Sequence, residues 1–246
     1  MIFRDDFSAF LNDFFEFQKF DDFCQNGLQV AGKSKIQKIA VGVSASKNFL
    51  KKAEKWGADA VFVHHGLFWG RGILAIDDFL KERLEILFRK KISLFAVHLP
   101  LDAHEKCGNN FEIARAFSLQ NIQKKDFFVS GILPKKLSFS EFSEKCEKIF
   151  GQKPNFAGDF SPKKIQKIGI CSGAGGDFLK HFSDIDAFLT GEIAERNWHE
   201  AREKKISLFA VGHLASERFG PRAFLKIAEK KFPQIQFSFF DEKCPV

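Results

Sequence analysis

The sequence predicts a mixed α/β fold made of two similar halves. Two stretches nearly repeat each other, since Lys91–Asp102 reads KISLFAVHLPLD and Lys205–Glu217 reads KISLFAVGHLASE. Further upstream, KIQKIAVGVS at Lys35–Ser44 pairs with KIQKIGICSG at Lys164–Gly173. Because the paired blocks come in the same order at similar spacing, we expect two copies of one α/β unit. Strands that alternate with helices in each copy favour a largely parallel sheet.

The first half is expected to span residues 1–120. Apolar residues at helical spacing predict a helix within 4–20, and the segment 21–32 is expected to be a turn region. Short apolar runs and amphipathic stretches then predict strands at 36–43, 60–63 and 92–97 and helices at 47–56, 76–90 and 110–117.

Residues 121–163 have no counterpart in the repeat and are expected to form an inserted connecting substructure. Residues 131–134 predict a strand that stops at a proline, and the capping-box spacing from Ser138 to Glu141 opens a helix to about residue 150. The second half, 164–246, is then predicted to hold strands at 165–171, 187–190 and 206–211, helices at 178–182, 193–204 and 216–231, and an edge strand at 234–239.

Composition narrows the class of protein. The formal charge of +7 is spread over scattered lysine doublets, which is typical of solvated surfaces, so we do not expect DNA binding. Five cysteines without a Cys-x-x-Cys pair argue against a disulfide framework and favour a reducing cytoplasm. We expect no secretory leader, because the opening stretch MIFRDDFSAF carries two early acids. We expect no association with a membrane, because no apolar run approaches the roughly 20 residues of a membrane span.

Histidines and carboxylates recur at matching points of the repeat and indicate a metal site. His98 precedes Asp102 by four residues, and His213 precedes Glu217 by the same interval. The first half adds the tandem pair His64 and His65 at the end of a predicted strand, where sites of α/β proteins gather. Neighbours in a regular strand point to opposite faces, so both serve one centre only if the chain turns there. Otherwise each binds a different metal, or one is a core histidine and the other lies on the surface.

The two pairs with four-residue spacing differ in what they predict. His213 and Glu217 share a helix face and could offer a nitrogen and an oxygen to one ion, although an exposed ion pair is the alternative. Pro100 bars a regular helix interior between His98 and Asp102. We therefore prefer Asp102 as a ligand, with His98 either binding the metal or supporting another ligand.

A glycine-rich loop, CSGAGG at 171–176, lies between a predicted strand and a predicted helix. Such a loop brings N–H groups close to an anion, although a tight turn that allows close packing is the alternative. Glu192 occupies the repeat position that corresponds to the tandem histidines, so it could face the same cleft as His64 and His65. The candidate phosphate-binding residues are Ser172, Gly173, Gly175 and Gly176.

Six short blocks are spread along the chain: NGLQV at 26–30, HHGLFW at 64–69, LDA at 101–103, SGAGG at 172–176, TGE at 190–192 and GHLASE at 212–217. Together they resemble the NIF-three-like family, whose bacterial members are often labelled GTP cyclohydrolase 1 type 2 homologs. The resemblance implies a dinuclear metal centre between the halves, with Glu217 as the bridge, and a toroidal hexamer built from two trimers. The implied metal ligands are His64, His65, Asp102, His213 and Glu217.

These observations lead to one expected function and one alternative. We expect a cytoplasmic hydrolase with two divalent ions that opens the imidazole ring of a purine nucleotide, as a GTP cyclohydrolase does. Glu192 or His98 would relay protons, and the glycine loop would hold phosphate. Nitrogen and carboxylate ligands without thiolate suit zinc, iron or manganese. The alternative is a non-enzymatic, metal-bearing ring that binds partner proteins or regulates transcription.

Overall fold

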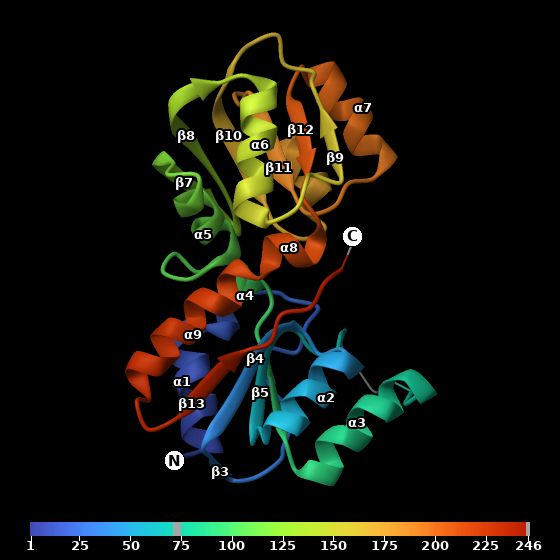
Figure 1. Cartoon of the computed structure of the whole chain (residues 1–246), viewed down its shortest axis with the longest axis vertical. Coiled ribbons are helices and arrows are strands. Elements are labelled where there is room, and N and C mark those ends of the chain that lie inside the picture. The colour runs from blue at the N-terminus through green and yellow to red at the C-terminus, as the bar shows by residue number, and fades with distance from the viewer. Residues whose placement is uncertain (71–74, 245–246) are drawn as a thin grey trace. The chain divides into compact units, whose positions relative to one another are not determined.

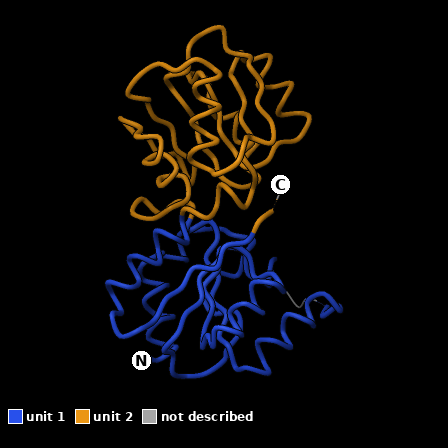
Figure 2. The backbone as a smooth tube through the Cα atoms, viewed as in Figure 1, with its two compact units in different colours: residues 1–101, 220–242 blue, residues 102–219, 243–246 orange. Residues whose placement is uncertain are grey.

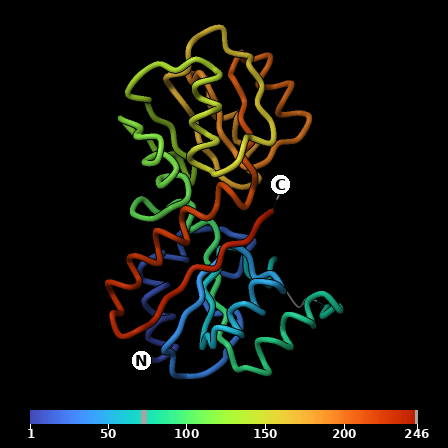
Figure 3. The backbone as a smooth tube through the Cα atoms, in the orientation of Figure 1, coloured from blue at the N-terminus to red at the C-terminus, as the bar shows by residue number. Residues whose placement is uncertain are grey.

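The computed structural model describes residues 1–70 and 75–244, which form two compact units (Figures 1 and 2). Unit 1 comprises 1–101 and 220–242, and unit 2 comprises 102–219 with the residues after 242. The chain therefore leaves unit 1 after residue 101, returns to it at 220 and leaves it again after 242, along the path that Figure 3 colours by residue number. No helix in these ranges is long and apolar enough to cross a membrane.

Unit 1 is built on a five-stranded sheet in the order β13-β4-β5-β6-β2, with a two-stranded β1-β3 ribbon. Within the five-stranded sheet the pairs are parallel except for β2, which runs antiparallel to β6, and the β1-β3 ribbon is antiparallel. The strands are β1 Ile2–Phe3, β2 Gly27–Val30, β3 Lys35–Ile36, β4 Lys38–Ser44, β5 Ala60–His65, β6 Ser93–Ala96 and β13 Gln236–Phe239. The helices are α1 Arg4–Phe15, the short η1 Phe17–Lys19, α2 Lys47–Trp56, α3 Asp78–Lys90, α4 Leu99–Asp102 and α9 Phe219–Lys231, the last two each sharing one residue with unit 2.

Alternating side chains of the central strands build two apolar layers in unit 1. Val61 and Val63 of β5 pack in one cluster with buried residues of α2 and α3. Phe62, between them, stacks instead on Phe224 of α9 with ring centroids 4.3 Å apart. Phe7 of α1 meets Phe95 of β6 edge to face at 5.1 Å, so α1 and α9 cover the second face. Helices thus cover both faces of the sheet.

Unit 2 is built on a six-stranded sheet in the order β7-β8-β10-β11-β12-β9. The central β10, β11 and β12 are parallel, and the outer strands are antiparallel to their neighbours. Its strands are β7 Gln120–Lys125, β8 Phe128–Leu137, β9 Phe156–Gly158, β10 Ile165–Cys171, β11 Ala187–Thr190 and β12 Ser207–Ala210. Its helices are α5 Asn109–Ala116, α6 Phe139–Phe150, the 3-10 helix η2 Gly175–His181, α7 Glu195–Lys204 and α8 His213–Glu217.

Unit 2 also has helices on both faces of its sheet. Ile168 and Ile170 of β10 cluster with Phe117, which follows α5, and with Phe142 of α6. Phe188 of β11 lies in a second cluster with residues of η2 and α7. The predicted insertion therefore supplies β7, β8, α6 and β9 to this sheet and its cover. The predicted boundaries near 120 and 163 describe the sequence repeat, whereas the compact units divide the chain at 101 and 219.

The two units share a common core topology, which agrees with the sequence repeat. β4-β5-β6 with antiparallel β2 in unit 1 corresponds to β10-β11-β12 with antiparallel β9 in unit 2. Asp59 accepts the N–H groups that begin β4, and Asp186 accepts those that begin β10. Lys91 and Lys205, both in left-handed conformation, end α3 and α7 in the same way.

At two prolines the observed strand and helix bounds differ from the predicted ones. Pro134 does not stop its strand, because β8 runs through it to Leu137 and the register with β10 shifts in this region, where a missing N–H is tolerated. The predicted helix 216–231 is two helices, α8 and α9, which meet at Arg218. Pro221 has no N–H to donate to Glu217, so it fits only the first turn of a new helix. The segment predicted as a turn, 21–32, contains the short strand β2.

Candidate metal centre

Three histidines of unit 1 come together at the carboxyl ends of β5 and β6. One ring nitrogen of each of His64, His65 and His98 lies within 4.8 Å of the others. The ring centroids of His64 and His65 are 4.6 Å apart, although they are neighbours on one strand. β5 ends at His65 and the chain bends at Leu67, so the two neighbouring side chains lie where the regular strand ends and both can serve one centre. The cluster is a candidate group of nitrogen ligands for a metal.

Hydrogen bonds fix the orientation of the tandem histidines. His64 is fully buried, and its Nδ1 donates to the carbonyl oxygen of Val97 at 2.9 Å. Because a carbonyl only accepts, the proton of the neutral ring is on Nδ1 and the lone pair is on Nε2. Nδ1 of His65 pairs with the hydroxyl of Ser44 at 2.9 Å. This arrangement, with one nitrogen held by the protein, is typical of histidines that bind a metal through the other nitrogen.

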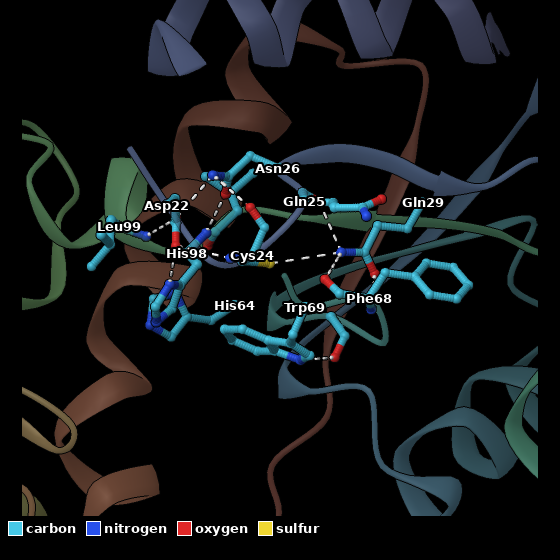
Figure 4. A network of polar contacts seen from close by, with 12 residues as sticks. Asp22, Cys24, Gln25, Asn26, Gln29, His64, Phe68, Trp69, His98 and Leu99 are labelled. Atoms are coloured by element: carbon cyan, nitrogen blue, oxygen red, sulfur yellow. Dashed lines mark hydrogen bonds and ion pairs between the residues drawn. The ribbon is translucent and has the colours of Figure 1, made fainter. Parts of the chain in front are cut away.

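His98 is held by a carboxylate that the sequence prediction did not include. Its Nδ1 lies 2.8 Å from Oδ1 of Asp22, whose side chain is 2% exposed (Figure 4). Burial alone would raise the pKa of Asp22, but hydrogen bonds and the charge of His98 and the hydrogen bonds of Asn26 and Cys24 lower it to about 2. Asp22 is therefore ionised and acts only as an acceptor.

The loop after His65 is held by the side chain of Gln29 (Figure 4). Its Oε1 accepts the N–H groups of Leu67 at 2.8 Å and Phe68 at 3.2 Å, and its Nε2 donates to the carbonyl of Phe68. A side chain at Gly66 would come within 2.3 Å of the same amide, so glycine is required there. The loop places Trp69 against His98, edge to face, with centroids 5.0 Å apart.

Unit 2 brings a histidine and two carboxylates together at the start of α8. Nδ1 of His213 lies 2.7 Å from Oε1 of Glu192, and its Nε2 lies 3.0 Å from Oε2 of Glu217. Burial opposes protonation of His213, but hydrogen bonds and charges of Glu217 and Glu192 outweigh it and raise its pKa to about 9. Glu217 is 4% exposed, so its charge is buried beside this imidazolium.

Asp102 is a second buried carboxylate of unit 2, 6% exposed as a residue. Its Oδ1 accepts from Nδ2 of Asn109 at 2.8 Å and from the hydroxyl of Ser172 at 3.3 Å. Asn110, next in sequence, accepts the N–H of Ser172 at 2.7 Å. Asn109 and Asn110, at the start of α5, thus connect Asp102 to the glycine loop. Neither asparagine was predicted from the sequence to have a role in the site.

The glycine loop packs closely beneath these acidic groups. The N–H of Ser172 donates to Asn110, and that of Gly173 donates to the hydroxyl of Ser216 at 2.9 Å. A Cβ atom at Gly173 would lie 2.0 Å from Oε1 of Glu217. One at Gly175 would lie 2.6 Å from the sulfur of Cys171, and one at Gly176 would lie 2.4 Å from Oδ1 of Asn197. Close packing, the alternative to an anion loop, therefore accounts for the glycines, and phosphate binding stays a prediction.

The predicted residues fall into two groups, one in each unit. His64, His65 and His98 are together in unit 1, and Glu192, His213 and Glu217 are together in unit 2, with Asp102 joined to the glycine loop. The donors are imidazole nitrogens and carboxylate oxygens, a set that fits zinc, iron or manganese. The absence of a side chain at Gly173 makes room for Glu217. Of the supporting residues missed by the sequence prediction, Asn26 and Gln29 lie in the NGLQV block, whereas Asp22 had no signal.

A cavity of about 420 Å³ adjoins His65 in unit 1. Besides Ser44 and His65 at one side, its described lining includes Trp69, Phe79 and Arg83. The guanidinium of Arg83 lies over the ring of Phe79 at 3.4 Å and donates to the carbonyl of Ala45. Aromatic walls with a few polar groups are typical of a site for a small planar ligand.

The fold and the two donor groups define an α/β protein with candidate metal-ligand groups. Comparison with known proteins gives the family: the model of Duf34/NIF3 (NGG1p interacting factor 3) matches residues 3–245, and the chain belongs to this family. A relative from Haemophilus influenzae, named GTP cyclohydrolase 1 type 2 homolog, is 36% identical over 231 residues, covering 91% of this chain and 92% of the relative. One of the same name from Escherichia coli (strain K12) is 40% identical over 205 residues, covering 82% and 83%.

Solved structures agree with this assignment. A structure described as protein ybgI, of unknown function, is 34% identical, covers all of both chains and has a TM-score of 0.95. The structure of TTHA1606 from Thermus thermophilus is 32% identical, with the same coverage and a TM-score of 0.92. The mixed α/β fold predicted from the sequence, and the predicted family, are thereby confirmed.

Proposed function

We propose that the chain binds two divalent metal ions through His64, His65, Asp102, His213 and Glu217, with Glu217 as the bridge. The observation that carries the proposal is the pair of donor groups: converging imidazoles in unit 1, and a histidine with buried carboxylates in unit 2. Five ligands exceed the four of one structural zinc. That the two groups serve one dinuclear centre rests on the family, because they belong to different units.

We propose that the reaction is hydrolysis of a nucleotide, in the manner of a GTP cyclohydrolase. A bound pair of divalent ions supplies an activated water and stabilises a developing oxyanion. The protein's own residues then handle protons, with His98 and Glu192 as the candidates beside the ligands. Buried Asp102 and Glu217 supply the negative charge that retains the ions. The name of the relatives supports this reaction class, and the aromatic cavity beside His65 supports a planar base as part of the substrate.

The test is turnover of nucleotides, GTP included, by metal-loaded protein, followed by chelation and metal restoration. We expect chelation to abolish turnover and a divalent ion to restore it. Asp102→Ala should remove most activity while the fold is kept, because the residue lies at the end of a four-residue helix and not among the apolar clusters. If the loaded protein turns over no nucleotide, the alternative of a metal-bearing module that binds partner proteins replaces the enzyme.

We further propose that the chain assembles into a hexamer in the cytoplasm. Large apolar side chains are exposed on unit 1, among them Phe3 at 56%, Phe23 at 80% and Phe88 at 61%. Exposed apolar surface of this kind favours self-association. All five cysteines are free thiols, which suits a reducing compartment. Light scattering at micromolar concentration should give six chains, and a monomer would contradict the assembly. Activity and assembly must be measured on the same samples, since metal loss could act through either.

A further inference from the structure

Asp22 is a buried carboxylate to which the sequence analysis assigned no role. Each of its oxygens accepts two hydrogen bonds (Figure 4). Oδ1 accepts from the N–H of Cys24 at 3.0 Å and from Nδ1 of His98 at 2.8 Å. Oδ2 accepts from Nδ2 of Asn26 at 2.9 Å and from the N–H of Leu99 at 2.9 Å. Two of these four donors belong to His98 and its neighbour, so the carboxylate holds this part of the chain directly.

The same segment holds both the backbone and the ring of His98. The N–H of His98 donates to Oδ1 of Asn26 at 2.7 Å, and the edge of Trp69 limits rotation of the ring. Since an ionised carboxylate only accepts, Nδ1 of His98 must carry a hydrogen. In the neutral ring, Nε2 then carries the lone pair, and it is the nitrogen left to join the cluster with His64 and His65.

We propose that Asp22 is a positioning residue that keeps His98 in the Nδ1–H tautomer, so that Nε2 can take a proton during the hydrolysis proposed above. The proton passes from a water molecule or a substrate hydroxyl to Nε2. The hydrogen on Nδ1 stays there, and Asp22 stays ionised beside the imidazolium. The role in catalysis rests on the proposed function, whereas the tautomer can be measured without any activity.

Asp22→Asn should change the tautomer of His98, because only one of the two oxygens of Asp22 faces a donor that can become an acceptor. If the amide NH₂ replaces Oδ2, it faces two donors, Asn26 and the N–H of Leu99. If it replaces Oδ1, it faces only the N–H of Cys24, because His98 can shift its hydrogen to Nε2 and accept at Nδ1. The second orientation, with the NH₂ group at the position of Oδ1, leaves fewer donors without an acceptor and is therefore favoured. The variant should therefore hold His98 in the Nε2–H tautomer.

Asp59→Asn is the matched control. Asp59 is also a buried carboxylate of unit 1 that accepts two backbone N–H groups, from Gln37 and Lys38. It also pairs with the ammonium group of Lys33, and among the described residues it forms no hydrogen bond or ion pair with a histidine. Asp59→Asn thus removes a charge and disturbs a similar backbone cap without touching His98. Any effect common to both variants reports loss of structure, and any effect confined to Asp22→Asn reports positioning.

The experiment is ¹⁵N NMR of histidine ring nitrogens in full-length, metal-free protein, with His98→Gln identifying the signal among seven histidines. Wild type and Asp59→Asn should show protonated Nδ1 and unprotonated Nε2, and Asp22→Asn should show the reverse. An unchanged pattern in Asp22→Asn, or protonated Nε2 in the wild type, would overturn the proposal. These spectra decide the positioning role even if no nucleotide is hydrolysed.

Kinetics and metal content complete the test. Where turnover is found, Asp22→Asn should lower kcat by about 10²–10⁴-fold, the usual contribution of a general acid or base, at unchanged metal content. Asp59→Asn should keep kcat within a few fold. Loss of bound metal in Asp22→Asn would assign Nε2 of His98 to a metal ion and overturn its role as a proton acceptor.

Discussion

Gly173→Ala tests whether the close approach of the glycine loop to Glu217 serves metal binding. The added Cβ would lie 2.0 Å from Oε1 of Glu217 and 3.3 Å from Nε2 of His213. Ordinary contact begins at 3.4 Å, so the carboxylate oxygen must move by about 1.4 Å. Metal–ligand distances tolerate about ±0.2 Å, which makes this shift too large for an intact ligand. We expect metal affinity to fall at least 10–100-fold, the usual cost of disturbing the support of a ligand.

The effect on stability should be smaller. Gly173 has φ +62, so alanine there costs about 1–2 kcal/mol of folding free energy from backbone strain alone. The displaced atom is the end of a side chain and can turn aside. For a chain of this size, Tm should fall by roughly 2–4 °C per kcal/mol. Metal binding is therefore expected to fail in a protein that is still folded.

Gly151→Ala separates the two causes. Gly151 ends α6 in unit 2 with φ +73, and nothing lies within 4 Å of an added Cβ. This variant should lose a similar amount of stability and keep its metal. Elemental analysis after metal loading, with thermal unfolding of the same samples, provides the assay. Wild-type metal content in Gly173→Ala, or equal metal loss in both variants, would refute the reasoning.

Two further predictions concern the donors of unit 2. Glu217→Gln keeps the side-chain shape but removes its charge, so the occupancy of both metal ions should fall together. Loss of one ion alone would show that Glu217 is a ligand of a single ion and not a bridge. His213, with a pKa raised to about 9, carries a proton at neutral pH that a metal at Nε2 must displace. Affinity should therefore rise about tenfold per pH unit up to pH 9, and calorimetry in two buffers at pH 7.5 should detect about one released proton. Binding without dependence on pH or buffer would contradict this. Before metal binds, protonated His213 contributes stability that is complete below pH 6.5 and is lost as the pH rises through about 9, a slope that His213→Gln should remove.

Much of the fold could be predicted because periodicity and the repeat report local structure. The bounds of α2, β10 and β11 agree with the prediction, and the capping box of Ser138 and Glu141 begins α6 as expected. The errors fall where tertiary context overrides local signals. Pro134 is tolerated in β8 by an irregular register, and the four-residue β2 is too short for its periodicity to stand out from the surrounding turn.

The candidate site was also predictable only in part. The tandem pair predicted His64 and His65 as candidate ligands, and the repeated four-residue spacing of histidine and acid predicted His213, because ligand chemistry requires those residue types. The residues that form hydrogen bonds with these histidines and with His98 can be recognised only in the folded structure. Asp22 lies 76 positions from His98, and Ser44 lies 21 positions from His65, so no local spacing connects either pair. The glycine loop has two possible explanations in the sequence, an anion site and close packing; the structure shows the close packing, and anion binding stays a prediction.

The number of metal ions per chain tests the central claim most directly. Full-length protein should be purified without oxygen, loaded with zinc, iron or manganese in turn, freed of excess metal and measured by elemental analysis against protein concentration. The proposed ligands, three histidines and two buried carboxylates, predict two ions per chain for at least one of these metals. One ion or none after loading with each metal would contradict the dinuclear centre.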